Sequence, residues 1–146
     1  MVYDKANYLF HFMQEKALTS EQSTKLSWIL RLAMAGEFFG HGVFAWQLKA
    51  RFVEMLTAMT GIQGETAKTL IHYVGAVDML VAVLILLKPM RILLVWGTVW
   101  ALLTALARPV AGDPIWDFVE RFANIGVPLA LLYIRGWPKT TKEWFS

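Results

Sequence analysis

The chain contains no cysteine, carries little charge and has few breaks in its apolar segments. The missing cysteines exclude disulfides, thiolate metal sites, iron–sulfur clusters and cysteine nucleophiles. Charged residues make up 17% of the sequence and hydrophobic residues 57%, whereas soluble domains average about 25% and about 45–50%. The net charge of +3 is modest and the basic residues form no stripe, which argues against nucleic acid as a partner. This composition is typical of an integral membrane protein.

Four apolar segments are long enough to be membrane spans. They cover roughly residues 28–48, 69–87, 90–108 and 115–134, and about 20 apolar residues cross a hydrocarbon core of about 30 Å. The length of 146 residues allows one compact domain. The sequence therefore predicts an all-α, polytopic membrane protein. Its four-helix transmembrane bundle is expected over residues 28–135, between an N-terminal segment, 1–27, and a tail, 136–146.

Two amphipathic stretches outside these spans predict short helices on the membrane surface. The N-terminal one carries Tyr8 and Phe12 among charged residues, and it lacks the apolar core and cleavage site of a signal peptide. The second lies in the connection between the first two spans, where Phe52, Leu56 and Met59 share one helical face. It is expected either to anchor this connection in lipid or to lie as a lid over the bundle.

The distribution of basic residues predicts the orientation. Four crossings place both termini on one side, and that side collects most of the lysines and arginines: Lys5, Lys16, Lys25, Lys88, Arg91, Arg135, Lys139 and Lys142. The other side has only Lys49, Arg51, Lys68 and Arg108. The positive-inside rule therefore predicts a protein of the inner (plasma) membrane with both termini in the cytoplasm.

Polar and ionisable side chains inside the apolar segments are the candidate ligand-binding residues. They are Glu37, His41, His72, Asp78, Arg108, Glu120, Arg121 and Asn124. A charged group in hydrocarbon costs at least about 2.5–3.5 kcal/mol, so such residues face a bundle interior or an aqueous cavity. Most of them fall in the half of each segment that lies toward the side of the membrane opposite the two chain termini. The sequence thus predicts a polar pocket in the outer half of the bundle.

A purely structural role is the main alternative for these charges, because an ion-pair network can hold four short helices together without a ligand. Asp117 and Arg121, one helical turn apart, are expected to form such a local pair. In the same segment Pro128 cannot bond to the Asn124 carbonyl, which predicts a kink there.

The histidines admit three kinds of ligand. His41 and His72, on adjacent segments, could hold a haem, or a metal together with Glu37 and Asp78. Di-metal carboxylate bundles, however, use a Glu-x-x-His motif, usually twice, and only the looser Glu37-x-x-x-His41 is present, so haem and metal are disfavoured. A histidine near a carboxylate could instead hydrogen-bond to, or protonate, a quinone. No residue is assigned a catalytic role.

Three motifs resemble the DoxX-like family of small four-helix membrane proteins. They are Arg31-Leu-Ala-Met-Ala-Gly-Glu-Phe-Phe-Gly-His-Gly, Thr60-Gly-Ile, and Val74-Gly-Ala-Val-Asp78, the last with aspartate where the family usually has glutamate. The resemblance covers most of the chain and implies a four-helix bundle. Members have been linked to quinone-coupled oxidation, to redox membrane complexes and to receptor assembly, so the resemblance is compatible with a quinone-related role but implies no set of catalytic residues. The stretch Thr104–Asn124 is not part of the general family pattern.

These observations lead to two functional hypotheses. The first is a pocket protein that binds a lipid or quinone-type ligand, as a subunit of a membrane oxidoreductase. The second is a non-catalytic accessory or assembly subunit of a larger membrane complex, or of a homo-oligomer. A transporter is disfavoured because the chain has no inverted repeat.

Overall fold

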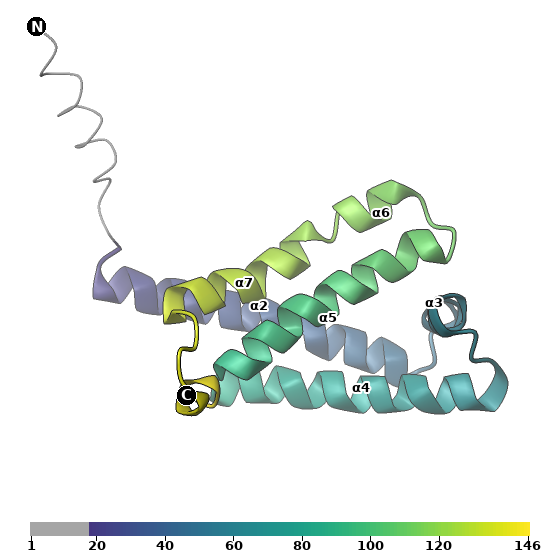
Figure 1. The fold of residues 1–146 in the computed structure, drawn as a ribbon, viewed down its shortest axis with the longest axis horizontal. Helices are drawn as coiled ribbons and strands as arrows, with labels where there is room; N and C mark the ends of the chain where they lie inside the picture. The colour runs from purple at the N-terminus through teal and green to yellow at the C-terminus, as the bar shows by residue number, and fades with distance from the viewer. Residues whose placement is uncertain (1–17) are drawn as a thin grey trace, which may run out of the picture.

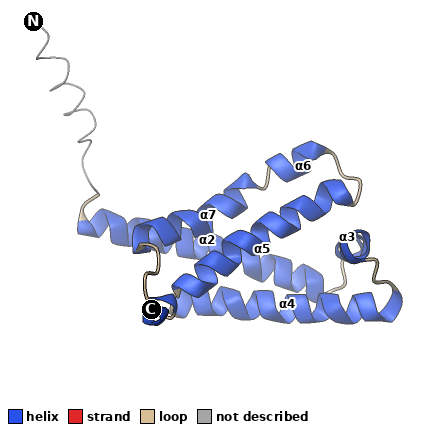
Figure 2. Cartoon of the chain, in the orientation of Figure 1, coloured by secondary structure: helices blue, strands red, loops and turns tan. Residues whose placement is uncertain are grey.

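The computed structural model describes residues 18–146, and every secondary-structure element in that part of the chain is a helix (Figures 1 and 2). The helices are α2 (Ser20–Trp46), α3 (Ala50–Thr60), α4 (Gly64–Leu87), α5 (Arg91–Val110), α6 (Ile115–Val119), α7 (Phe122–Arg135) and α8 (Thr141–Trp144). The surface helix predicted around Tyr8 and Phe12 lies outside the described residues. The helix predicted between the first two spans is confirmed as α3.

Local sequence signals determine where α2 and α3 begin and end. The Thr19 hydroxyl accepts a hydrogen bond from the Gln22 N–H, and the Gln22 side chain accepts one from the Thr19 N–H, at 3.2 and 3.0 Å. This capping box starts α2 at Ser20, well before the predicted boundary at residue 28. α3 ends at Gly61, whose φ of 75° suits a residue without a Cβ atom.

The long helices pack as a bundle that is open on one side. α2 packs along α4 and also against α7, while α5 packs against α7. α4 and α5 diverge from the turn at residues 88–90, and they do not pack on each other along their length (Figure 1). α3 lies between their far ends and contacts both.

A close helix contact lies at the crossing of α2 and α4, where Gly42 meets Gly75. A Cβ atom on Gly75 would lie 2.7 Å from the Gly42 carbonyl oxygen, so the two backbones approach more closely than any larger residue allows. On α4 the predicted inward face of Gly75, Asp78 and Ala82 is buried, as expected. The apolar core occupies the half of the bundle away from α3, around Leu94 and its neighbours.

The fourth predicted span is not one helix, and the prediction of a continuous segment at 115–134 is wrong in this respect. α6 ends at Val119 and α7 begins at Phe122. Around Arg121 the backbone forms hydrogen bonds between residues three apart, as in a 3₁₀ turn. The Arg121 N–H donates to the Phe118 carbonyl at 3.1 Å. By contrast, α7 continues through Pro128, so the helix is interrupted at Glu120 and Arg121 rather than at the proline.

Among the described residues, two helices are long and apolar enough to cross a membrane, α4 and α5.

We expect Gly42→Ala to destabilise the protein and Gly40→Ala, two residues earlier on α2, to leave stability unchanged or slightly higher. A methyl group at Gly42 would lie 2.6 Å from Met79 Cγ and 2.8 Å from the Gly75 carbonyl oxygen, whereas one at Gly40 meets nothing within 4 Å. Overpacking costs about 1–3 kcal/mol of unfolding free energy, while Gly to Ala in an open helix gains roughly 0.5–1 kcal/mol. Thermal unfolding of both variants in one detergent measures the difference, and equal midpoints would contradict the close crossing.

Candidate functional site

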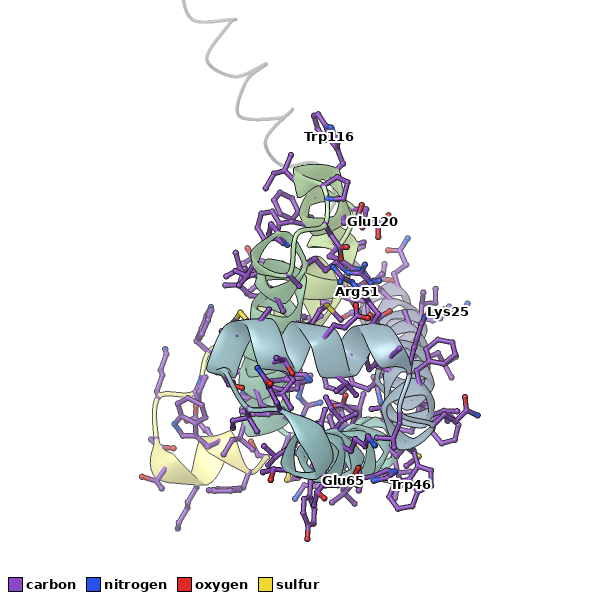
Figure 3. All side chains as sticks on the ribbon, turned by 90° about the vertical axis from the view of Figure 1, so that its right-hand side faces the viewer. Lys25, Trp46, Arg51, Glu65, Trp116 and Glu120 are labelled. Atoms are coloured by element: carbon purple, nitrogen blue, oxygen red, sulfur yellow. The ribbon has the colours of Figure 1, made fainter. Side chains whose placement is uncertain are left out.

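A cavity of about 240 Å³ lies beneath α3, on the side where α4 and α5 diverge. Its walls are mainly apolar and come from α3, α4 and α5, with two side chains from α2 and the α6–α7 break: Phe52, Met55, Leu56, Met59, Ile71, Val74, Asp78, Trp100, Leu103, Thr104, Arg108, His41 and Arg121 are among them. The predicted apolar face of α3 thus covers the cavity, which is the lid position (Figure 3, which views this end).

Asp78 is the buried charge of this cavity. Its residue is 4% exposed, and it is the only buried polar or charged side chain among the described residues. No lysine, arginine or histidine in residues 18–146 forms an ion pair with it. Trp100, on the facing wall, directs its indole N–H toward the carboxylate. An unpaired carboxylate in an apolar wall is costly, so this position is not explained by packing alone.

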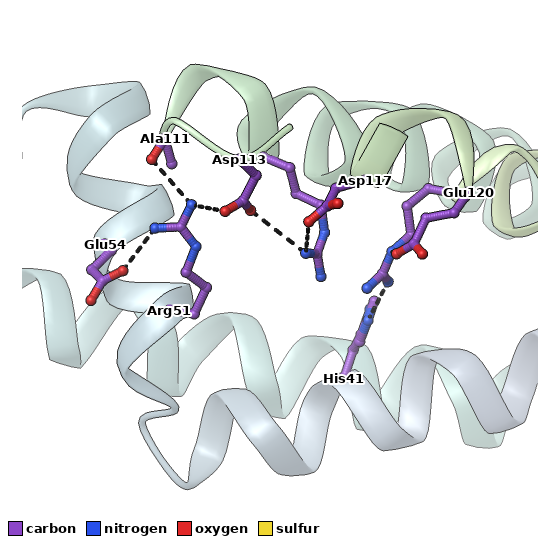
Figure 4. A network of polar contacts seen from close by, with 9 residues as sticks. His41, Arg51, Glu54, Ala111, Asp113, Asp117 and Glu120 are labelled. Carbon is purple, nitrogen blue, oxygen red and sulfur yellow. Dashed lines mark hydrogen bonds and ion pairs between the residues drawn. The ribbon is translucent and has the colours of Figure 1, made fainter. Parts of the chain in front are cut away.

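A second group of side chains joins α2 to the start of α7. The Asn124 amide donates to the Glu37 carboxylate at 2.5 Å, and Arg121 Nη1 lies 3.1 Å from His41 Nε2 and 3.7 Å from Glu37 Oε1. His41 Nδ1 in turn lies 3.5 Å from the same Glu37 oxygen. Figure 4 shows His41 and Glu120, and Arg121 contacts both of them, at 3.1 Å and 3.5 Å. The four inner side chains therefore form one connected network at the α6–α7 break.

A third group holds α3 in place. Arg51 donates to the Glu54 carboxylate at 2.8 Å, to the Ala111 carbonyl at 3.1 Å and to the Asp113 carboxylate (Figure 4). The hydrogen bonds to Glu54 and Asp113 raise the pKa of the Arg51 guanidinium above its ordinary value, so it stays charged. The other Asp113 oxygen lies 3.6 Å from Arg108. This chain of contacts ties the covering helix to the loop between α5 and α6.

The structure brings together most of the predicted site residues. Glu37, His41, Arg121 and Asn124 form the network, while Asp78 and Arg108 line the cavity. Glu120 touches Arg121 only at the rim, where its side chain is 62% exposed.

The structure does not place His72 at the cavity, and it does not form one of the predicted ion pairs. His72 packs edge-on against Trp46, with ring centroids 5.3 Å apart, and is not among the cavity-lining residues. His72 lies at the same predicted depth in the membrane as the other pocket residues, but its side chain is on a face of α4 that packs against Trp46 instead of the cavity. The local Asp117–Arg121 pair does not form either. Because the helix is interrupted between them, Asp117 lies 3.5 Å from Arg108 and Arg121 turns toward α2.

Sequence reasoning missed Arg51 and Asp113, which lie in connections far apart in the chain and follow no helical periodicity. Trp100 had a usable signal, since a tryptophan near the middle of an apolar span is unusual.

Within the described part of the chain, no group of three or more His, Asp or Glu side chains is arranged to hold a metal ion. Comparison with family models, curated proteins and solved structures gives no match for this chain.

We expect Glu37→Gln to lower the unfolding free energy by about 1–2 kcal/mol, because Arg121 then loses its partly buried counter-charge. Glu120→Gln is the matched control, since it removes the other carboxylate beside Arg121 from a site that is 62% exposed. Exposed pairs contribute about 0–1 kcal/mol, so the control should change little. Thermal or denaturant unfolding in detergent compares them. If both variants behave alike, the network does not stabilise the α2–α7 contact.

Proposed function

We propose that this chain is a four-crossing integral membrane protein of the inner membrane that binds an uncharged headgroup, of a quinone-type molecule or a lipid, in the cavity beneath α3. The observation that carries the proposal is the buried, unpaired Asp78 carboxylate in the wall of an otherwise apolar cavity. In this role the protein would serve as a binding subunit for a membrane oxidoreductase.

The outward surface supports the membrane placement. Each long helix exposes large apolar side chains, among them Leu32 on α2, Leu80 on α4, Val99 on α5 and Leu129 on α7. Soluble monomers rarely expose contiguous apolar patches of more than a few hundred Å². Apolar exposure on four helices fits a surrounding of lipid chains.

The fourth crossing requires both α6 and α7. α7 has 14 residues, which at 1.5 Å per residue give about 21 Å, short of a core of about 30 Å. α6 supplies the remaining length. Irregular backbone at membrane depth is tolerated where protein groups surround it, and the break at Arg121 lies against the polar network.

The charge balance around the cavity favours a hydrogen-bond donor over an anion as the ligand. Arg121 lies 3.7 Å from Glu37, and Arg108 lies 3.6 Å from Asp113, so both cations have counter-charges. Asp78 has none. An anion would find no unpaired cation here, whereas the hydroxyl of a quinol or of a neutral lipid could form a hydrogen bond with the Asp78 carboxyl group. The Arg108 guanidinium, which lines the same cavity and has five N–H donors, could serve a carbonyl oxygen.

The size of the cavity limits what fits. Pockets for drug-sized ligands measure about 300–1,000 Å³, and this cavity measures about 240 Å³. It therefore suits a single ring or a compact headgroup, with the tail outside.

We expect Asp78→Asn to weaken binding of a soluble short-chain benzoquinol at least about tenfold, which is the loss of one hydrogen bond to a charged acceptor. Binding is measured by quenching of tryptophan fluorescence in detergent. The same variant should be at least as stable as the parent, because it removes a buried unpaired charge. A stability loss that accompanies weaker binding would instead indicate a structural role.

Glu65→Gln is the control for this experiment, since it removes a carboxylate from the same helix at a side chain that is 87% exposed. It should leave binding unchanged. Unaltered benzoquinol binding in Asp78→Asn would contradict the assignment of the cavity, and a neutral lipid that co-purifies and is lost in Asp78→Asn would identify the lipid alternative.

A second candidate, an accessory subunit, is favoured by Trp96. Its indole stacks on Trp100, with centroids 5.4 Å apart and planes inclined by 12°, yet Trp96 stays 41% exposed on α5. Exposed aromatic side chains are frequent anchors of interfaces. If a partner docks here, Trp96→Ala should release the protein from a larger complex in native-detergent size analysis, whereas Trp116→Ala, at the 73% exposed Trp116, should not. A small monodisperse species from native membranes would count against this function.

A further inference from the structure

Three arginines meet at the end of the bundle opposite α3. They are Arg31 on α2, Arg91 at the start of α5 and Arg135 at the end of α7. Arg91 donates to the main-chain carbonyl of Arg135, and Arg31 donates to the Ile85 carbonyl near the end of α4, the helix that leads into the turn before Arg91. In residues 18–146 no Asp or Glu side chain forms an ion pair with any of the three. The cluster therefore concentrates positive charge without a side-chain carboxylate beside it, although Arg91 Nη1 also donates to the Glu143 carbonyl at 3.2 Å and lies 3.5 Å from the Ser146 main-chain oxygen.

Backbone carbonyls hold two of these guanidinium groups in fixed positions. Arg31 Nε donates to the Ile85 carbonyl at 3.0 Å, and its Nη2 donates to Leu86 at the end of α4. Arg91 donates to the carbonyls of Arg135 at 2.6 Å and Gly136 at 2.8 Å, at the end of α7. These bonds satisfy free carbonyls of helix ends, but they leave the charges uncompensated.

Arg135 is different, because its side chain has no hydrogen-bond acceptor among the described residues. Its Nε atom is buried and unpartnered. The nearest acidic residue in the tail, Glu143, accepts instead from the Lys139 N–H at 2.9 Å and from the Thr140 hydroxyl at 3.2 Å. Buried donors without acceptors are uncommon, so an acceptor from outside the chain is indicated.

An apolar groove runs along the surface between α2 and α7. It is lined by Leu26, Leu30, Gly126, Leu129, Tyr133 and Ile134, among others. Leu30 and Ile134 stand next in sequence to Arg31 and Arg135, so the groove reaches the helix turns that carry these two arginines. Trp28 stacks on Arg31 at 3.9 Å.

We propose that Arg31, Arg91 and Arg135 bind the phosphate of an anionic phospholipid whose acyl chain lies in the groove between α2 and α7. Arg135 Nε is free to donate to a phosphate oxygen, while Arg31 and Arg91, whose donors are bonded to carbonyls, contribute positive charge. The adjoining apolar groove selects a lipid over free phosphate. This site rests on the proposed membrane placement but not on the cavity beneath α3, which lies at the other end.

The test uses the full chain, delipidated in a neutral detergent and titrated with phosphatidylglycerol or with phosphatidylcholine of the same acyl chains. Bound lipid is counted by native mass spectrometry. Phosphatidylglycerol should bind more tightly, and Arg135→Gln should weaken it about fivefold or more, the contribution of one arginine near anionic lipid. Lys142→Gln, which removes one exposed positive charge from the C-terminal tail after α7, is the matched control and should have little effect.

A second variant tests the groove without touching the charges. A Cβ atom at Gly126 meets nothing within 4 Å, so Gly126→Leu should fold normally and fill the groove. It should weaken phosphatidylglycerol binding while the protein keeps its unfolding midpoint. Equal binding of the two lipids, or equal losses in Arg135→Gln and Lys142→Gln, would overturn the site. Competition by inorganic phosphate at similar concentrations would overturn the lipid assignment. If the chain is instead recovered in the soluble fraction without detergent, the membrane placement itself is wrong.

Discussion

At the crossing of α2 and α4 there is no space for a side chain, because Gly42 and Gly75 place their backbones in direct contact. This contact draws α4 against α2 along much of its length. α5 takes its contacts from α7 instead, and the side between α4 and α5 stays open. α3 and the cavity occupy that side. The position of the polar site thus depends on two glycines, neither of which lines it.

The two ends of the bundle differ in electrostatic character, and each favours a different chemistry. Beneath α3 the arginines have carboxylate neighbours, so the unpaired group is the acceptor Asp78. At the opposite end the arginines have carbonyl acceptors but no Asp or Glu partner among the described residues, so the unpaired group is the donor Arg135. An apolar core around Leu94 separates them. One end therefore suits a neutral hydrogen-bond donor and the other an anion.

The sequence allowed prediction of features that depend on residues one or two turns apart. The covering face of α3 and the inward face of α4 around Asp78 follow from helical spacing. The break before Phe122 could not be predicted in this way, since Arg121 there turns toward His41 on another helix. His72 has the depth of a pocket residue, but its direction depends on how α4 is rotated. The Arg51 contact with the α5–α6 loop joins connections that have no periodic pattern.

A structural role for the charges explains some of them better than others. Glu37 has Asn124 and Arg121 as partners, as expected of a carboxylate that joins two helices. Asp78 has no cationic partner, and it lies on the one side where helix packing is incomplete. Both features lower stability, one through an unpaired buried charge and the other through lost packing contacts. Folded proteins tolerate such combined costs chiefly where a site needs them, so the proposed ligand would account for Asp78 where helix association does not.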